Sequence, residues 1–146
     1  MIFDFQTVKK QPVNFTQINK VLKSSFKTIK SSRMVKKISA DNSFALAYES
    51  MLQTSLALML SRGYRPKVQL GHHRTLVSFA MFILTDFQSL TDTYDKMRKT
   101  RNKIIYDILS VSDTEAERAI LIAEKYFWVV EDKIAQDNPQ QKLWRP

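Results

Sequence analysis

Apolar residues recur three and four positions apart along most of this chain, and this spacing is the strongest constraint on its fold. One such stripe follows Asn14 and consists of Phe15, Ile18, Leu22, Phe26 and Ile29. Apolar residues at this spacing lie on one face of an α-helix. The 146 residues include only two Gly and four Pro, so few positions favour tight hairpins. The sequence therefore predicts an all-α, up-and-down bundle of four to five helices in one domain, residues 1–146, with an N-terminal arm (1–13) and a C-terminal tail (137–146).

The expected helix boundaries follow from capping residues. The first helix begins after Asn14 and has a possible break at Ser31-Ser32, and the second begins at Asp41 or Ser43 and ends near Arg62. A basic loop then leads to a third helix that begins at His72 or His73 and ends at Leu84. Residues 75–84 are nearly all apolar, so we expect this helix to be central. The last helix, about 113–136, begins after a capping box formed by Ser112 and Glu115.

Composition indicates a soluble, cytoplasmic protein. The chain has no Cys, so neither a disulfide framework nor a thiolate metal site is expected. No apolar run approaches the ~18 residues that cross a bilayer, and the first residues lack the pattern of a signal peptide. We expect no membrane association, no cofactor and no bound metal; His72 and His73 lack a nearby acid or Cys that would complete a metal site.

The net charge of +9 is concentrated near the N-terminus. Residues 1–40 contain nine Lys or Arg and a single acid, Asp4. Four lysines in this segment, Lys20, Lys23, Lys27 and Lys30, lie at helical spacing opposite the apolar stripe. Such a stripe can follow a phosphate backbone or lie on anionic lipid, or it can simply be a solvated face. Nucleic acid is the first partner that this charge predicts.

The stretch 94–107 is predicted to be an amphipathic helix with an unusual polar face. Its apolar seam runs from Tyr94 and Met97 through Arg101 to Ile104, Ile105 and Ile108. A second, polar stripe beside the seam consists of Asp95, Arg98, Asn102 and Tyr106. In one interpretation Arg101 and Asn102 bind each other and an acid such as Asp95 or Asp107. In the other, the stripe is a functional site.

The segment 101–106, Arg-Asn-Lys-Ile-Ile-Tyr, resembles the signature of HEPN domains, which are small helical proteins that often cleave or handle RNA. That signature has Arg, a polar residue that is commonly Asn, three further residues and His; here Tyr106 stands in place of the His. The sequence around it, roughly 41–136, including His72-His73, is also similar to the family. By this resemblance Arg101 holds a phosphate, Asn102 orients it or a base, and Arg98 and Lys99 add positive charge. The resemblance also implies a homodimer that pairs this helix, and a cognate antitoxin or a nucleotidyltransferase as a possible partner.

Tyr106 leaves the chemistry open. A phenol titrates near pH ~10 and an imidazole near ~6.5, so an unperturbed Tyr is a poor base at neutral pH. Tyr106 acts as an acid or positioning group, His72 or His73 supplies the proton transfer, or the site binds RNA without cleaving it. The leading prediction is a HEPN-like, metal-independent endoribonuclease of toxin–antitoxin or defence type. The alternative is a catalytically inactive HEPN module that binds nucleic acid or a protein partner, and an unrelated DNA-binding helical protein is the third hypothesis.

Overall fold

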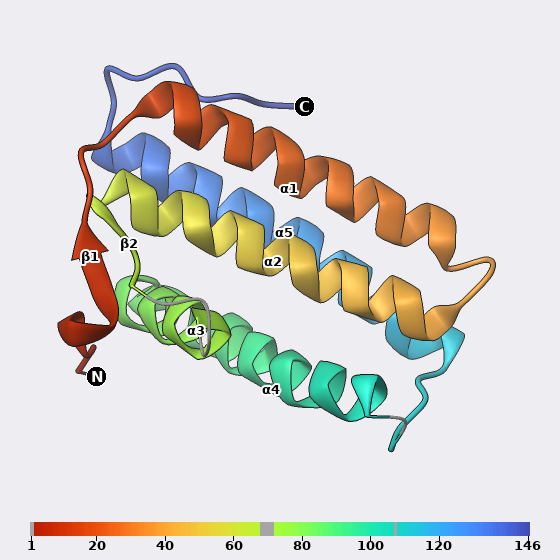
Figure 1. The fold of residues 1–146 in the computed structure, drawn as a ribbon. Coiled ribbons are helices and arrows are strands. Elements are labelled where there is room, and N and C mark those ends of the chain that lie inside the picture. The colour runs from red at the N-terminus through yellow and green to blue at the C-terminus, as the bar shows by residue number, and fades with distance from the viewer. Residues whose placement is uncertain (1, 68–71, 107) are drawn as a thin grey trace.

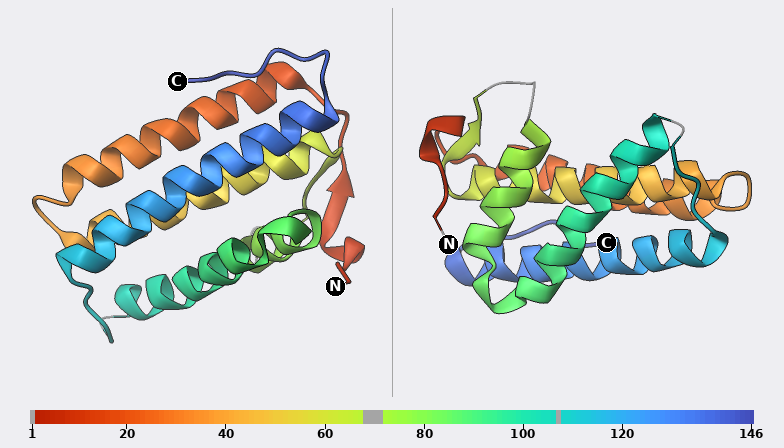
Figure 2. Two further views of the ribbon diagram at one scale, coloured as in Figure 1. Left: turned by 180° about the vertical axis from the view of Figure 1, so that it is seen from behind. Right: turned by 90° about the horizontal axis from the view of Figure 1, so that it is seen from below.

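The computed structural model describes residues 2–67, 72–106 and 108–146, and this part of the chain folds as a bundle of five α-helices with a small sheet. Helices α1 (Phe15–Val35), α2 (Ala40–Ser61) and α5 (Asp113–Asp137) lie side by side (Figure 1). Helix α1 is antiparallel to the other two. Helices α3 (His72–Ile83) and α4 (Gln88–Ile105) form an open V across them (Figure 2). The predicted all-α bundle of four to five helices is confirmed, although α3 and α4 cross the other helices instead of lying along them.

The central helix is α2, and not α3 as the apolar run of residues 75–84 suggested. Helix α2 contacts each of the other four helices, and most of its side chains are buried. Many of these are small serines and threonines, whose hydroxyls bond within the helix: Ser50 Oγ donates to the carbonyl of Ala47 and Thr54 Oγ1 to that of Ser50. Because these hydroxyls are satisfied by carbonyls of the same helix, and that of Ser43 by a carbonyl of α1, a Ser-rich helix can be buried at little cost.

The hairpin of α1 and α2 is closed by a pair of serines. Ser32 Oγ donates to the carbonyl oxygen of Ser43 at 2.7 Å, and Ser43 Oγ donates to that of Ser32 at 2.8 Å. The possible break at Ser31-Ser32 is therefore wrong, since α1 continues to Val35. Ser39, and neither Asp41 nor Ser43, caps α2 by accepting a hydrogen bond from the amide of Asn42. Asp41 instead accepts from the amide of Val111, which ties down the segment before α5.

The N-terminal arm contains a short 3-10 helix, η1 (Phe5–Thr7), and a strand, β1 (Val8–Lys10), that pairs antiparallel with β2 (Tyr64–Pro66). This sheet was not predicted. Gly63, with a φ of 82°, makes the turn from α2 into β2, so the glycine expected to stop the helix does so in the conformation that glycine tolerates best. The buried ring of Phe3 packs edge-on against Phe79 of α3, which anchors the arm.

The C-terminal tail also packs on the body. It runs back along α1 (Figure 1), where the ring of Trp144 packs tilted against Phe26 and edge-on to Phe127. The backbone amide of Trp144 donates to Asn19 Oδ1 at 2.7 Å. Between α3 and α4 lies a second 3-10 turn, η2 (Thr85–Phe87). Helix α5 begins with the predicted capping box of Ser112 and Glu115.

Candidate functional site

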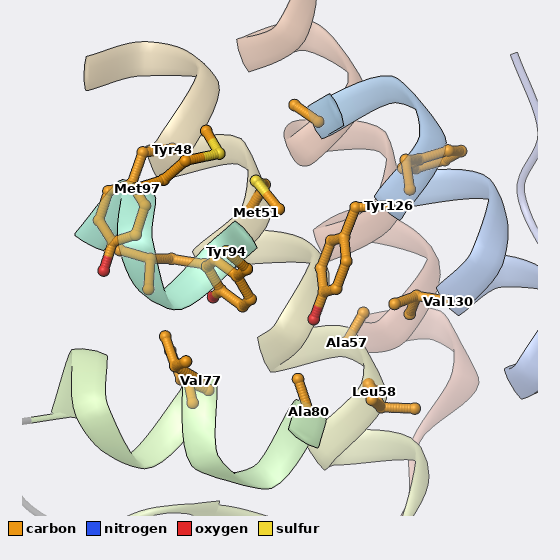
Figure 3. Close-up of a cluster of buried hydrophobic side chains, with 14 of the residues drawn as sticks. Tyr48, Met51, Ala57, Leu58, Val77, Ala80, Tyr94, Met97, Tyr126 and Val130 are labelled. Carbon is orange, nitrogen blue, oxygen red and sulfur yellow. The ribbon is translucent and has the colours of Figure 1, made fainter. Parts of the chain in front are cut away.

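A buried tyrosine network fixes α4 against the rest of the bundle. Ser55 Oγ of α2 lies 2.9 Å from the hydroxyl of Tyr94 on α4 and 2.6 Å from that of Tyr126 on α5. Figure 3 shows Tyr48, Tyr94 and Tyr126 together in the core, next to Met51 and Met97. The network holds the first half of α4, so the polar face of the same helix is presented in a fixed orientation.

The polar face of α4 contains a guanidinium, that of Arg101, for which no described residue is an acid partner. Asp95 accepts from Nε of Arg98 at 2.9 Å and lies 3.6 Å from Nζ of Lys99. Arg101 makes only a long hydrogen bond, 3.4 Å, from Nη1 to Asn102 Oδ1, and no ion pair with any described residue. The interpretation in which Asp95 satisfies Arg101 is therefore wrong, and Asp107 lies outside the described residues. An arginine without a carboxylate keeps its full charge for an anionic ligand.

His73, at the start of α3, lies within the electrostatic reach of Arg98 and Arg101 on α4. Its Nδ1 lies 3.2 Å from the hydroxyl of Tyr48, and its ring stands edge-to-face with that of His72, with 4.8 Å between centroids. Burial lowers the pKa of His73, and His72, Arg101 and Arg98 lower that pKa further through their positive charge. The sequence left open whether a histidine approaches the Arg101 stripe; in the structure His73 lies within its electrostatic reach. We call Tyr48, His73, Arg98 and Arg101 the Arg–His cluster.

The hydroxyl of Tyr48 influences which ring nitrogen of His73 carries the proton. Burial raises the pKa of Tyr48 although Arg101 and Arg98 oppose the shift, so its hydroxyl keeps its proton. The hydroxyl can donate to Nδ1 or accept from it. When Nδ1–H of His73 donates to Tyr48, the lone pair of Nε2 is left available, and this is the tautomer that a general base requires.

Sequence reasoning missed the role of Tyr48. Its helical spacing assigned it correctly to the inward face of α2, and it is fully buried. The hydrogen bond to His73 joins residues 25 positions apart, so no local pattern could have indicated it.

Tyr106 lies outside the Arg–His cluster. It is the C-terminal cap of α4 and 75% exposed, and its side chain makes no hydrogen bond or ring contact within the described part of the chain. Three neighbouring apolar residues are also exposed: Ile105 (51%), Ile108 (73%) and Leu109 (39%). The apolar seam predicted for this helix is therefore buried at Tyr94 and Met97, packs against the core again at the partly buried Ile104, and is exposed at Ile105 and Ile108. We call Ile105, Tyr106, Ile108 and Leu109 the apolar patch.

The lysine stripe lies elsewhere. Lys20, Lys23, Lys27 and Lys30 are exposed on α1, which lies on the opposite side of α2 from α4 (Figure 1). The structure thus brings His73 to Arg98 and Arg101 but separates the lysine stripe from them. Two other cations at the end of this segment, Arg33 and Lys36, pair with Glu117 of α5 at 3.2 and 2.7 Å.

In the described ranges, no group of three or more His, Asp or Glu side chains is arranged to hold a metal ion. No helix there combines the length and apolar character needed to cross a bilayer. Comparisons of the chain with protein-family models, curated proteins and solved structures found no match. The resemblance to HEPN domains stays a prediction from the motif at residues 101–106 and its setting.

Proposed function

We propose that this protein is a HEPN-like, metal-independent endoribonuclease whose site is the Arg–His cluster. The observation that carries the proposal is the position of Arg101, which has no acid partner among the described residues and lies near a histidine of lowered pKa. A cation for the phosphate and a neutral imidazole that can act as a base are two of the three groups that cleavage of RNA through its 2′-hydroxyl needs; the third is an acid for the departing oxygen.

In the proposed mechanism His73 takes the proton of the 2′-hydroxyl while that oxygen attacks the adjacent phosphorus. Arg101 and Arg98 stabilise the negative charge that develops on the phosphate oxygens. The bond to the 5′-oxygen then breaks, giving a 2′,3′-cyclic phosphate and a 5′-hydroxyl. The departing oxygen takes a proton from an acid, for which the exposed phenol of Tyr106 is the candidate. Asn102 keeps the role that the resemblance implies, which is to orient the phosphate or a base.

The test is cleavage of total RNA and tRNA in EDTA by the wild type, Arg101→Ala, His73→Asn and Tyr106→Phe. Loss of Arg101 should slow cleavage about 10²–10³-fold, and loss of His73 about 10²–10⁴-fold. Lys103→Ala is the matched control, because it removes a positive charge from an exposed position of the same helix, two residues away. Cleavage that continues unchanged in Arg101→Ala would contradict the proposal.

The apolar patch favours a second candidate function, a HEPN-like module that binds RNA or a protein without cleaving. Adjacent exposed apolar side chains at the end of a helix are typical of protein-binding surfaces. A second copy of the chain, a cognate antitoxin or a nucleotidyltransferase are the partners proposed for it. Sedimentation of the wild type and Ile108→Asp tests the homodimer: the wild type should sediment as a dimer and the variant as a monomer.

A further inference from the structure

A pocket of about 350 Å³ lies beside the Arg–His cluster, between α1, α2, α3 and β2. This volume is within the range of ~300–1,000 Å³ typical of small-molecule sites. Among the described residues its walls include the side chains of Leu52, Leu56 and Leu76, which offer apolar surface to a flat ligand. Two residues that line the pocket are sequence neighbours of cluster residues. His72 precedes His73, and Glu49 follows Tyr48.

Two hydrogen-bond acceptors stand together on the α2 wall of this pocket. Gln53 Oε1 is buried and has no hydrogen-bond partner among the residues that the structure describes. Glu49 precedes it by four residues, so both side chains lie on the same helix face, and Glu49 forms no ion pair or hydrogen bond with any described residue. A buried acceptor without a donor is unfavourable, so this wall is suited to a ligand with two adjacent N–H groups.

A hydrogen-bond donor lies on the β2 side of the pocket. Arg65 is exposed, lines the pocket, and has no ion pair within the described ranges. Its guanidinium can donate two parallel hydrogen bonds to acceptors on one edge of a ligand. The complementary ligand is therefore planar, with apolar faces, two N–H donors on one edge and two acceptors on the other.

We propose that this pocket binds a guanine base of RNA. Guanine has adjacent N1–H and N2–H donors, which suit Glu49 and Gln53, and the O6 and N7 acceptors that arginine recognises in pairs. Adenine has no such pair of donors, and uracil has a single ring N–H. The inference rests on the proposed function: because His72 lines the pocket and its neighbour His73 is the proposed base, a guanosine held here would direct cleavage to positions near it.

The experiment measures binding of GMP, IMP and AMP to the full chain by isothermal titration calorimetry. IMP lacks only the N2 amino group, so it isolates one of the predicted contacts. We expect GMP to bind roughly five- to a hundredfold more tightly than AMP, with IMP between them. Glu49→Gln and Gln53→Met should remove this preference while thermal unfolding by circular dichroism shows that both variants fold. Asp92→Asn, which neutralises an exposed acid of α4 outside the pocket, should retain it.

The outcomes separate this inference from the proposed function. Equal binding of GMP and AMP, together with RNA cleavage that depends on Arg101, would overturn the guanine pocket and leave the ribonuclease proposal standing. Selective GMP binding that depends on Glu49, without RNA cleavage, would support the pocket and contradict the ribonuclease. A GMP preference that survives both Glu49→Gln and Gln53→Met would overturn the inference, because the base would then bind elsewhere.

Discussion

The sharpest test of the packing that positions the candidate site is the substitution Ser55→Ala. Ser55 Oγ donates to the carbonyl of Met51 at 2.8 Å and lies within 2.9 Å of the hydroxyls of Tyr94 and Tyr126. Burial raises the pKa of Tyr94 and that of Tyr126, so both phenols keep their protons. Since the Ser55 proton is directed at Met51, its oxygen accepts from both phenols.

The expected loss of stability follows from these contacts. Alanine removes the acceptor of two fully buried hydroxyls, and each unsatisfied group costs about 1–3 kcal/mol. The free energy of unfolding should therefore fall by roughly 2–6 kcal/mol, a large part of the ~5–15 kcal/mol typical of a domain. For a chain of this length Tm should fall by about 5–15 °C.

Urea unfolding followed by circular dichroism measures this change. Ser50→Ala is the matched control, because Ser50 is equally buried on α2 but bonds only to Ala47 of its own helix, at 2.6 Å. It should cost less than about 1.5 kcal/mol. Combining Ser55→Ala with Tyr94→Phe and Tyr126→Phe should restore part of the loss, since no unpaired hydroxyl remains. Equal destabilisation by Ser55→Ala and Ser50→Ala would refute the reasoning.

Three further predictions concern protonation, capping and the lysine stripe. The folded pKa of His73 is lowered from 6.5, so the unfolded chain takes up this proton first and stability should fall as pH decreases below ~6.5; His73→Asn should flatten this part of a stability–pH profile. Ser112→Ala removes the capping box of α5 and should cost about 1 kcal/mol in urea unfolding. The double substitution Lys23→Gln and Lys27→Gln should leave the rate of RNA cleavage at physiological salt nearly unchanged. These lysines lie on α1, across α2 from α4, and charges separated by more than ~8 Å are screened. A loss of rate as large as that of Arg101→Ala would instead indicate that RNA binds on α1.

Local patterns in the sequence predicted the helices well, because their spacing and caps are local properties. The capping box at Ser112, the stop at Gly63 and the start of α3 at His72 were all readable in this way. The sheet was not, since strands of three residues carry too little alternation to be recognised. Ser32 resembles a helix breaker in the sequence, but its hydroxyl bonds across the hairpin to Ser43.

In the candidate site, too, features that depend on local spacing could be predicted, and contacts between distant residues could not. The arginines of α4 could be identified from spacing, but not that Asp95 pairs with Arg98 and leaves Arg101 without an acid among the described residues. His73, and not His72, is within hydrogen-bond distance of Tyr48. This contact depends on how α3 crosses α2, and no periodicity in the sequence indicates that crossing. Pocket-lining acceptors such as Gln53 were also hidden, because a glutamine on a buried helix face looks like any other polar position until its surroundings are known.

The first half of α4 packs in the core, and the second half contains Arg101 of the candidate site. The first half is held by Tyr94 and Met97, both buried, while the half that contains Arg101 ends in the exposed apolar patch. An exposed helix end with several large apolar side chains gains stability when a partner covers it. A second copy of the chain docked there would order the end of α4 and bring the phenol of Tyr106 closer to a second Arg–His cluster. In the proposed enzyme, the C-terminal end of α4 is therefore expected to serve both purposes: Arg101 and Tyr106 act in catalysis, and Tyr106 also belongs to the apolar patch through which the chain dimerises.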